Sequence, residues 1–261
     1  MSTFRERYGP WAFIAGASEG LGEAFAHAIA SRGLNVIVAA RRAEKLEAVA
    51  ESLRAQHGIA AVAMPMDLAD TAMLEVTLRH LVEDYELGLL VYNAALSPKG
   101  AYLDVALDDH LRALDVNARA ALMCTHAVGR EMRRRKRGGI VLMSSMSGMY
   151  GTGSVVSYAA TKAFQTNLAE GLWGELEGTV DVIATVAGPI RTPGYEAAAE
   201  VDVAHVLAPA DVVAETLDAL GRQPMVIPGW RARWSARMLR MLPRANVIRI
   251  MRRATRKMLG E

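Results

Sequence analysis

Tyr158 and Lys162 are four residues apart in a helix-forming stretch, which places a phenol and an ammonium on one face of a helix. A tyrosine that relays a proton near neutral pH needs its pKa lowered from about 10 to about 7 or 8, which requires roughly 3 to 4 kcal/mol. One cation about 4.5 Å away supplies roughly 3.7 kcal/mol at an effective dielectric constant of about 20. The pair is compatible with an acid/base tyrosine, and equally with a partly buried tyrosine beside a lysine whose stem covers it.

A glycine-rich turn near the start of the chain is typical of phosphate binding. Trp11 to Ala15 is predicted to be a buried strand, and it leads into the run Gly16-Ala-Ser-Glu-Gly-Leu-Gly22 before a predicted helix. Gly16 would permit a positive φ, Gly20 a close approach to a pyrophosphate, and Gly22 close packing of helix on strand. The N–H groups at the helix start would hold the phosphates, although a glycine turn of this GxxxGxG spacing can also be only a turn.

Two further polar residues follow in an informative order. Ser145 comes directly after the strand-like run Gly139 to Met143, 13 residues before Tyr158, and Asn117 lies in the helical stretch around Leu111 to Arg134. With the three glycines, Tyr158 and Lys162 in this order, the chain resembles the short-chain dehydrogenase/reductase family along residues 8 to 229.

The resemblance implies a catalytic tetrad of Asn117, Ser145, Tyr158 and Lys162. Tyr158 would be the acid/base, and Lys162 would lower its pKa and bind the nicotinamide ribose. Ser145 would polarise the substrate oxygen, and Asn117 would hold a water chain to Lys162. The implied cofactor-binding set is Gly16, Ser18, Gly20, Leu21, Gly22, Arg41, Arg42, Asp67, Leu68, Asn93, Ala94, Tyr158, Lys162, Ile190 and Thr192.

The end of the second predicted strand indicates NADP(H). A carboxylate about 20 residues beyond the glycines would bind the ribose 2′-OH of NAD, but this chain has Arg41 and Arg42 there. A guanidinium can bind a 2′-phosphate through two parallel hydrogen bonds. The alternative is that both arginines are solvent-exposed residues at the start of the next helix. Glu19 adds an opposing negative charge nearby. Asp67 would accept from the adenine amino group, or would be a turn residue or helix cap.

Short apolar runs alternate with helical ones, as expected for a parallel sheet covered on both faces. We predict a single-domain α/β fold of Rossmann type, with a doubly wound seven-stranded sheet. The predicted strands are Trp11–Ala15, Asn35–Ala40, Ala60–Met66, Leu89–Asn93, Gly139–Met143, Asp181–Val186 and Met225–Ile227. The predicted helices are Glu23–Ser31, Glu44–Gln56, Met73–Tyr85, Asp108–Lys136, Val156–Glu177 and Pro209–Gly221.

Composition agrees with one enzyme domain. The 261 residues are 52% hydrophobic, enough for one core, and Cys124 is the only cysteine, so no intramolecular disulfide forms. We expect a cytoplasmic protein, because the first residues lack an apolar signal stretch and no apolar run approaches about 18 residues. No metal is expected.

The loops after the fourth, fifth and sixth strands should line the substrate pocket, and their apolar content favours a lipophilic substrate under a lid at about 193–208. The candidates are Leu96, Met146, Met149, Tyr150, Pro189 and Tyr195, each of which could equally be a packing residue. The first three-fifths of the chain is similar to NADP-linked 7β-hydroxysteroid dehydrogenases, and part of it to 3-oxoacyl-thioester reductases. We expect oxidoreduction between a secondary alcohol and a ketone, with a non-catalytic cofactor-sensing or membrane-docking module as the competing class.

The tail, 230–261, differs from the domain at 1–229. Residues 231–261 hold ten Lys/Arg and one acid, a local charge of +9, so the rest of the chain carries −7. Apolar residues recur every three or four positions on both sides of Pro243, which predicts two basic amphipathic helices meeting there. They could dock on anionic lipid, on another subunit or on the chain's own body. Resemblance implies a homodimer or homotetramer through the helices of Asn117 and Tyr158. Arg133–Arg137 ends a helix, so nucleic acid is not invoked.

Overall fold

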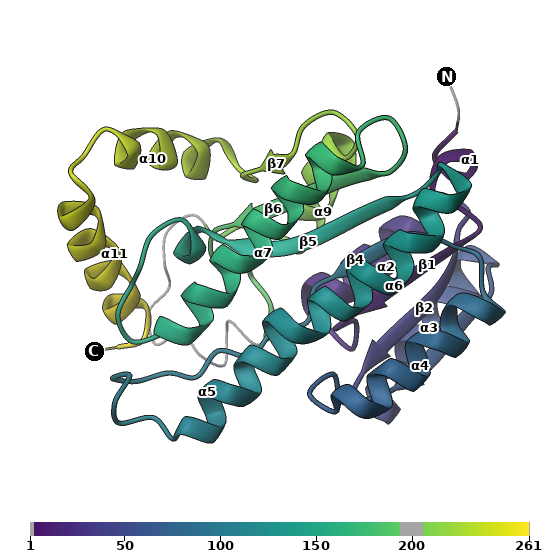
Figure 1. Cartoon of the computed structure of the whole chain (residues 1–261), viewed down its shortest axis with the longest axis horizontal. Coiled ribbons are helices and arrows are strands. Elements are labelled where there is room, and N and C mark those ends of the chain that lie inside the picture. Colours follow the sequence, from purple (N-terminus) through teal and green to yellow (C-terminus); the bar gives the residue numbers. More distant parts are fainter. Residues whose placement is uncertain (1–2, 194–205, 261) are drawn as a thin grey trace.

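Seven parallel strands form one sheet in the order β3-β2-β1-β4-β5-β6-β7 in the computed structural model, which describes residues 3–193 and 206–260 (Figure 1). The strands are β1 (Trp11–Ala15), β2 (Asn35–Ala40), β3 (Ala61–Pro65), β4 (Leu87–Tyr92), β5 (Gly139–Ser145), β6 (Asp181–Ala187) and β7 (Met225–Val226). The predicted seven-stranded parallel sheet is confirmed, with strand ends that differ by at most two residues. The strand order reverses between β1 and β4, which is where open α/β sheets bind ligands.

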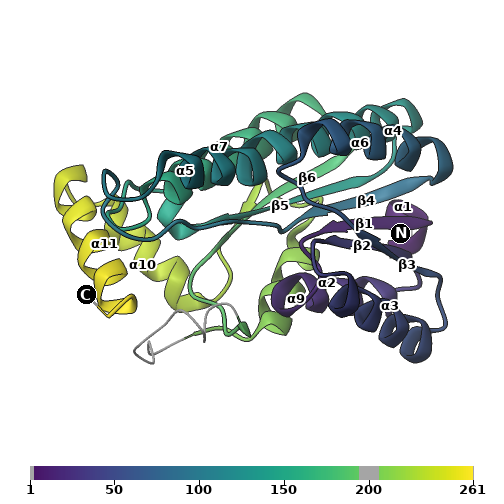
Figure 2. The same ribbon diagram turned by 90° about the horizontal axis from the view of Figure 1, so that it is seen from below.

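Helices cover both faces of the sheet, so the doubly wound architecture is confirmed (Figure 2). One face carries α2 (Gly20–Ala30), α3 (Ala43–His57) and α9 (Pro209–Ala219). The other carries α4 (Thr71–Asp84), α5 (Leu107–Leu114), α6 (Ala120–Arg135) and α7 (Val156–Glu175). A short helix that the sequence analysis did not predict, α1 (Phe4–Tyr8), precedes β1.

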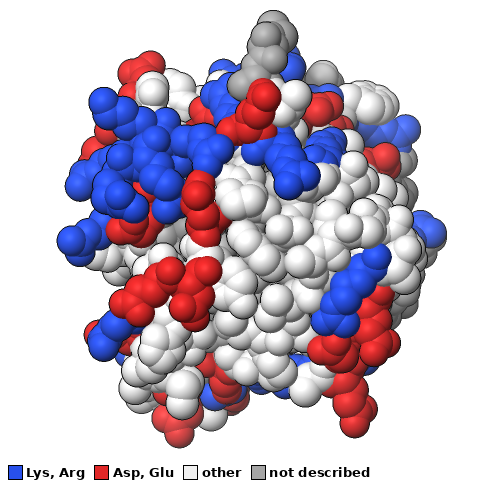
Figure 3. All heavy atoms as spheres, turned by 90° about the vertical axis from the view of Figure 1, so that its right-hand side faces the viewer, with Lys and Arg blue, Asp and Glu red and all other residues white. Residues whose placement is uncertain are grey.

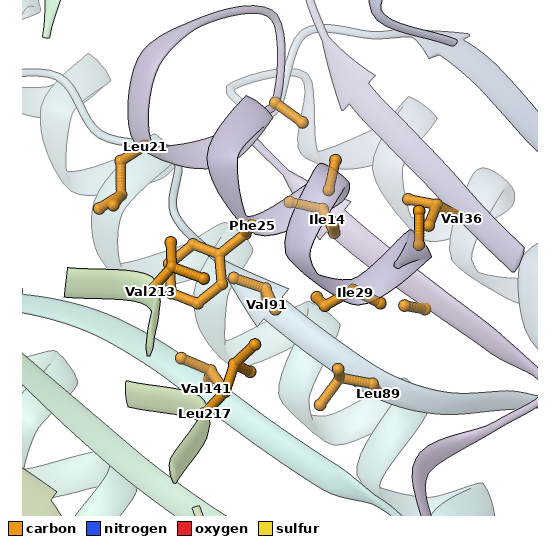
Figure 4. Close-up of a cluster of buried hydrophobic side chains, with 14 of the residues drawn as sticks. Ile14, Leu21, Phe25, Ile29, Val36, Leu89, Val91, Val141, Val213 and Leu217 are labelled. Atoms are coloured by element: carbon orange, nitrogen blue, oxygen red, sulfur yellow. The ribbon is translucent and has the colours of Figure 1, made fainter. Parts of the chain in front are cut away.

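The core on the α2 and α9 side is built from apolar residues of strands and helices (Figure 4). Phe25 and Ile29, four residues apart on α2, face the sheet, and Ile14 of β1 meets them. All three side chains are fully buried. Each such side chain contributes about 1.5–3 kcal/mol by leaving water, which is why the sheet holds the turns at its carboxyl edge in fixed positions.

The helix predicted over Asp108–Lys136 is interrupted, and this part of the prediction was wrong. A π-helical segment, η1 (Asp115–Arg119), separates α5 from α6. The Asn117 amide explains the interruption, because its Oδ1 accepts from Leu96 N–H at 2.7 Å and its Nδ2 donates to Leu96 C=O at 2.7 Å. The wider turn brings Val116, Asn117 and Ala118 into the interior together, and such π-segments are frequent at functional sites.

The glycine turn between β1 and α2 has the geometry that the sequence predicted. Gly16 has φ +86°, and a Cβ built on it would lie 2.6 Å from the Cα of Ala94. A Cβ on Gly22 would lie 2.1 Å from the carbonyl oxygen of Gly16, so helix and strand approach closely only because this residue is glycine. The helix begins at Gly20, three residues before the predicted start.

Two helices follow β7, as predicted for the tail. They are α10 (Trp230–Arg240) and α11 (Arg244–Met258), and they meet at Pro243. Figure 1 shows them at the left end of the molecule. Within 3–193 and 206–260, no helix is long and apolar enough to cross a membrane.

The opposite end of the molecule carries charges of both signs side by side (Figure 3). The basic run at the end of α6 is largely paired: Arg134 contacts Glu131 at 2.9 Å, and Arg137 forms an ion pair with Glu86. Arg137 also donates to the carbonyl of Glu6 at 2.9 Å. These contacts agree with a structural role for the run at a helix end.

Candidate active site

A cavity of about 980 Å³ opens at the carboxyl edge of the sheet and brings most of the predicted site residues together. The predicted residues on its wall are Gly16, Ser18, Gly20, Leu21, Arg41, Arg42, Asp67, Leu68, Asn93, Ala94, Leu96, Ser145, Met146, Tyr158, Lys162, Pro189, Ile190 and Thr192. They come from turns that follow β1 to β6 and from the first two turns of α7.

Five predicted residues are not on this wall. Gly22 and Asn117 are buried behind it. Met149 and Tyr150 do not line the cavity, because the chain turns outward after the short 3-10 helix η2 (Met146–Gly148) and the Tyr150 ring packs against the guanidinium of Arg244, 5.7 Å from it. Tyr195 and most of the lid expected at 193–208 lie outside the described residues.

Ser145 and Tyr158 lie together on the cavity wall, where the Ser145 hydroxyl acts to lower the pKa of Tyr158. The Ser145 hydroxyl accepts from Ser147 twice, from its N–H at 3.2 Å and from its hydroxyl at 2.9 Å. With its lone pairs occupied in this way, the Ser145 hydroxyl proton is directed at an acceptor in the site. Ser147 was missed, although its position two residues after Ser145 in a serine-rich turn was a signal.

Burial raises the pKa of Tyr158, and the contact with Ser145 only partly opposes this. Burial and the Ser145 contact account for the direction of this pKa shift, and the lowering of the Tyr158 pKa by Lys162 stays a prediction. The Lys162 ammonium lies 5.6 Å from the centroid of the Tyr158 ring and donates elsewhere, to Met143 C=O at 2.5 Å and to Gln165 Oε1 at 2.8 Å. Desolvation of the phenol therefore dominates.

Lys162 is itself perturbed. Its side chain is 2% exposed, and burial lowers its pKa to about 7. The charge of the ammonium therefore depends on the acceptors around it.

Gln165 links Lys162 to Asn117. Its Oε1 accepts from Lys162 Nζ, and its Nε2 donates to the main-chain carbonyl of Asn117 at 2.8 Å. This fully buried amide joins Lys162 to Asn117 directly, and the water chain that the family resemblance implies between them stays a prediction. Gln165 was missed, and its signal was a polar residue three positions after Lys162, on the same face of the helix.

The other end of the cavity suits a dinucleotide. The side chain of Glu19, the N-cap residue, does not cap the N-terminus of α2, whose first residues, Gly20 and Leu21, lie on the wall. Asn93 Nδ2 donates to Gly16 C=O at 2.7 Å and fixes the glycine turn. Open helical N–H groups fit a pyrophosphate, and the neighbouring cations Arg41 and Arg42 fit a further phosphate.

Asp67 is also on this wall, and its carboxylate is partly engaged. Oδ1 accepts from Ala69 N–H at 3.0 Å, and Oδ2 pairs with Arg112 at 2.5 Å. Burial alone would raise the pKa of Asp67, but these two contacts together hold it below its usual value. Asp67 thus stabilises its own turn and also forms an ion pair with Arg112 of α5.

The C-terminal helix α11 supplies a wall that the sequence analysis did not assign to the site. Met251, Ala254, Thr255, Met258 and Leu259 line the cavity, and Thr255 also contacts Thr152, Oγ1 to Oγ1, at 3.0 Å. The apolar stripe of α11 therefore faces the chain's own site. The stripe of α10 does not: Trp230, Trp234 and Met241 are 67%, 62% and 75% exposed.

No metal centre accompanies the site in the described ranges, where no group of three His, Cys, Asp or Glu side chains could hold an ion.

Residues 10–202 match the family model described as short chain dehydrogenase. The chain belongs to the short-chain dehydrogenase family. It is 33% identical over 236 residues to a 7β-hydroxysteroid dehydrogenase of Collinsella aerofaciens, covering 87% of this chain and 89% of that one. A solved structure from work on 7β-hydroxysteroid dehydrogenase stereoselectivity is 30% identical, with a TM-score of 0.90 over 96% of this chain and 99% of that chain. A short-chain dehydrogenase of Sphingobium yanoikuyae solved with NADPH is 29% identical, with a TM-score of 0.77 over 87% of this chain and 92% of that chain.

Replacing Gln165 by Leu should make activity more sensitive to alkaline pH. A buried charge that loses one acceptor is disfavoured by about 1–3 kcal/mol, so the pKa of Lys162 should fall further below its ordinary value. We expect kcat to fall roughly tenfold at about pH 8 and much less at about pH 5, where Lys162 of the variant is largely charged again. Gln165→Glu places a carboxylate against Lys162, raises its pKa and should retain activity at the higher pH. Parallel kcat profiles for Gln165→Leu and the wild type would show that Gln165 only fills space.

Proposed function

We propose that this chain is an NADP(H)-dependent oxidoreductase that interconverts a lipophilic secondary alcohol and its ketone, with a hydroxysteroid-like substrate favoured. The observation that carries the proposal is one cavity with three parts. Its cationic end holds Arg41 and Arg42, its inner end holds Ser145 and Tyr158, and its far wall is the apolar face of α11.

The residues divide the chemistry among them. A bound nicotinamide supplies the hydride for reduction or accepts it in oxidation. In reduction, the Tyr158 hydroxyl donates its proton to the ketone oxygen, and the raised pKa of Tyr158 keeps that proton in place until then. Ser145 donates a hydrogen bond to the same oxygen, where negative charge develops. In oxidation, the same groups work in reverse, and Tyr158 takes the alcohol proton.

A steroid is favoured over an acyl chain for two reasons. The similarity to the 7β-hydroxysteroid dehydrogenase structure extends over 96% of this chain, so it includes most of the tail that walls the cavity. The wall residues from α11 and its C-cap are two methionines, an alanine, a leucine and one threonine, which form a mostly apolar surface. A 3-oxoacyl thioester remains the alternative substrate. A non-catalytic cofactor-binding module is disfavoured, because all four tetrad residues are present and Ser145, Tyr158 and Lys162 share the wall of one cavity.

Tyr158→Phe should abolish nearly all turnover while leaving NADPH affinity and thermal stability unchanged, because only the transferable proton is removed. NADPH oxidation would be followed with a panel of oxo-steroids and 3-oxoacyl thioesters. Ser145→Ala should lower kcat with a smaller effect on NADPH affinity. Wild-type kcat in Tyr158→Phe would remove Tyr158 as the acid, and turnover only with the thioesters would favour the alternative substrate.

We propose NADP(H) over NAD(H) because no acid stands at the end of β2. Arg41, Arg42 and Ser18 lie together on the cavity wall, and Arg42 Nη2 donates to Ser18 Oγ at 2.7 Å. A related short-chain dehydrogenase structure contains NADPH.

Changing Arg41 and Arg42 together to Ala should erase most of the preference for NADPH over NADH, because charge-assisted bonds to the 2′-phosphate are lost. A loss of roughly 100-fold in NADPH affinity is expected, with little change for NADH. Dissociation constants from nicotinamide fluorescence check this, with Arg79→Ala as a control on the exposed face of α4. Equal wild-type affinities for the two cofactors would contradict the assignment.

We also propose a homo-oligomer, either dimer or tetramer. Exposed apolar side chains lie along the helices of Asn117 and Tyr158, and they are Leu107, Leu111, Leu114, Leu122, Val156 and Phe164. The exposed row of α10 is proposed to pack on a second subunit, because the +9 tail and the −7 remainder of the chain attract one another between copies. Leaving two tryptophans in water is costly at about 25 cal/mol per Å².

Changing Trp230 and Trp234 together to Gln should weaken self-association in sedimentation velocity, while Met73→Gln, a substitution of an exposed apolar residue on α4, should not. The tail helices remain, so the cavity wall is preserved in this variant. Anionic vesicles should make no difference. A peripheral membrane contact would be favoured instead if the variant assembled like the wild type and the wild type co-sedimented with anionic vesicles in a salt-sensitive way.

A further inference from the structure

Glu19 forms ion pairs with Arg42 and Lys45 at the end of the cavity that we assign to the adenosine ribose. Its Oε1 accepts from Arg42 Nη2 at 2.7 Å, and its Oε2 accepts from Lys45 Nζ at 2.9 Å. The bonds from Arg42 and then Lys45 hold the pKa of Glu19 below its usual value, so the carboxylate is charged at neutral pH. An internal anion therefore engages one arginine of the Arg41–Arg42 pair.

This arrangement is not needed to start the helix. Glu19 is the N-cap residue of α2, the position from which a side chain commonly accepts a helical N–H, yet its side chain makes no such bond. The carboxylate instead points across the turn to the residues that follow β2. Its contacts connect the β1–α2 turn to the start of α3. They therefore lie between the glycine turn, which suits a pyrophosphate, and the Arg41–Arg42 pair, which suits a 2′-phosphate.

A 2′-phosphate would need the same donors. Ser18, Glu19, Arg41 and Arg42 share the cavity wall, and the Arg42 group that pairs with Glu19 also donates to Ser18. A guanidinium fork binds one planar or tetrahedral anion well, and a second anion within a few Å repels the first. Glu19 and a 2′-phosphate are therefore alternatives for Arg42.

We propose that the Glu19 carboxylate competes with the 2′-phosphate of NADP(H) for Arg42, so that it weakens NADP(H) binding and narrows the preference over NAD(H). This rests on the proposed use of NADP(H). Glu19 would then reduce the preference for NADP(H) that Arg41 and Arg42 create, and Lys45, its second partner, would keep the carboxylate at this end of the cavity.

Glu19→Gln tests the competition, because it keeps the size and hydrogen-bonding groups of the side chain and removes the charge. We expect NADP⁺ and adenosine 2′-monophosphate to bind roughly fivefold more tightly to the variant, as befits two partly exposed ion pairs. NAD⁺ and adenosine 5′-monophosphate, which lack the 2′-phosphate, should change by less than about twofold. Isothermal titration of the full-length protein without cofactor measures all four ligands and does not depend on turnover.

Two controls isolate the effect. Glu23→Gln removes the same charge one turn further along α2, off the cavity wall, and should leave all four affinities unchanged. In an Arg42→Ala background, the gain from Glu19→Gln should shrink, because the contested cation is gone. Thermal unfolding midpoints establish that each variant folds. If Glu19→Gln does not fold, Glu19→Ala replaces it, and the same tighter binding of NADP⁺ and adenosine 2′-monophosphate is expected.

Unchanged or weaker binding of NADP⁺ and adenosine 2′-monophosphate by folded Glu19→Gln would overturn the proposal, since Glu19 would then position Arg42 rather than compete for it. The cofactor assignment fails separately. Equal wild-type affinities for NADP⁺ and NAD⁺ would refute the assignment, whereas a preference for NADP⁺ that appears only in Glu19→Gln would still support competition.

Discussion

The buried ammonium of Lys162 is the constraint on which the rest of the site depends. Removing such a charge from water costs several kcal/mol unless hydrogen bonds replace its hydration. Met143 C=O and Gln165 Oε1 provide those bonds, and both acceptors come from regular structure, a strand and a helix. Gln165 in turn donates to the carbonyl of Asn117, and the Asn117 amide holds Leu96. The charge of one lysine therefore ties β5, α7, η1 and the β4–α5 loop together.

Burial of this network also acts on the pKa values of Tyr158 and Lys162, the pair to which we assign the acid/base step. Burial keeps the Tyr158 proton on the phenol and pulls the pKa of Lys162 down to about 7. Both shifts come from desolvation, so both respond to anything that changes the polarity of the cavity. Spacing along a helix brings the two groups near each other, but the direction in which Lys162 donates is decided by acceptors from other elements.

The two ends of the cavity differ in polarity. The end to which we assign the cofactor offers main-chain N–H groups and charged side chains, so anion affinity there depends on which anion the cations hold. The end to which we assign the substrate is lined by mostly apolar side chains from the C-terminal helix, whose basic face is turned away from the cavity. A single amphipathic helix thereby separates a lipophilic site from the charged surface of the molecule.

The sequence by itself determined the sheet, its helices and most of the cavity wall. Apolar runs with turn residues between them specify parallel strands, and the crowded contacts at Gly16 and Gly22 leave no residue but glycine at those positions. Tyr158, Lys162, Ser145 and Asn117 were recognisable from order and spacing, because a family of such sites repeats them. Two tail helices meeting at Pro243 also followed from local pattern alone.

Tertiary structure decided what those residues contact. The π-turn around Asn117, the amide of Gln165 between Lys162 and Asn117, and the pairing of Glu19 with Arg42 each depend on a partner from a distant element. The two halves of the tail look alike in sequence, yet α11 faces the cavity while the tryptophans of α10 face solvent. Periodicity shows that a helix has an apolar side, but only the packed chain shows which surface that side meets, because burial is set by elements far apart in the sequence.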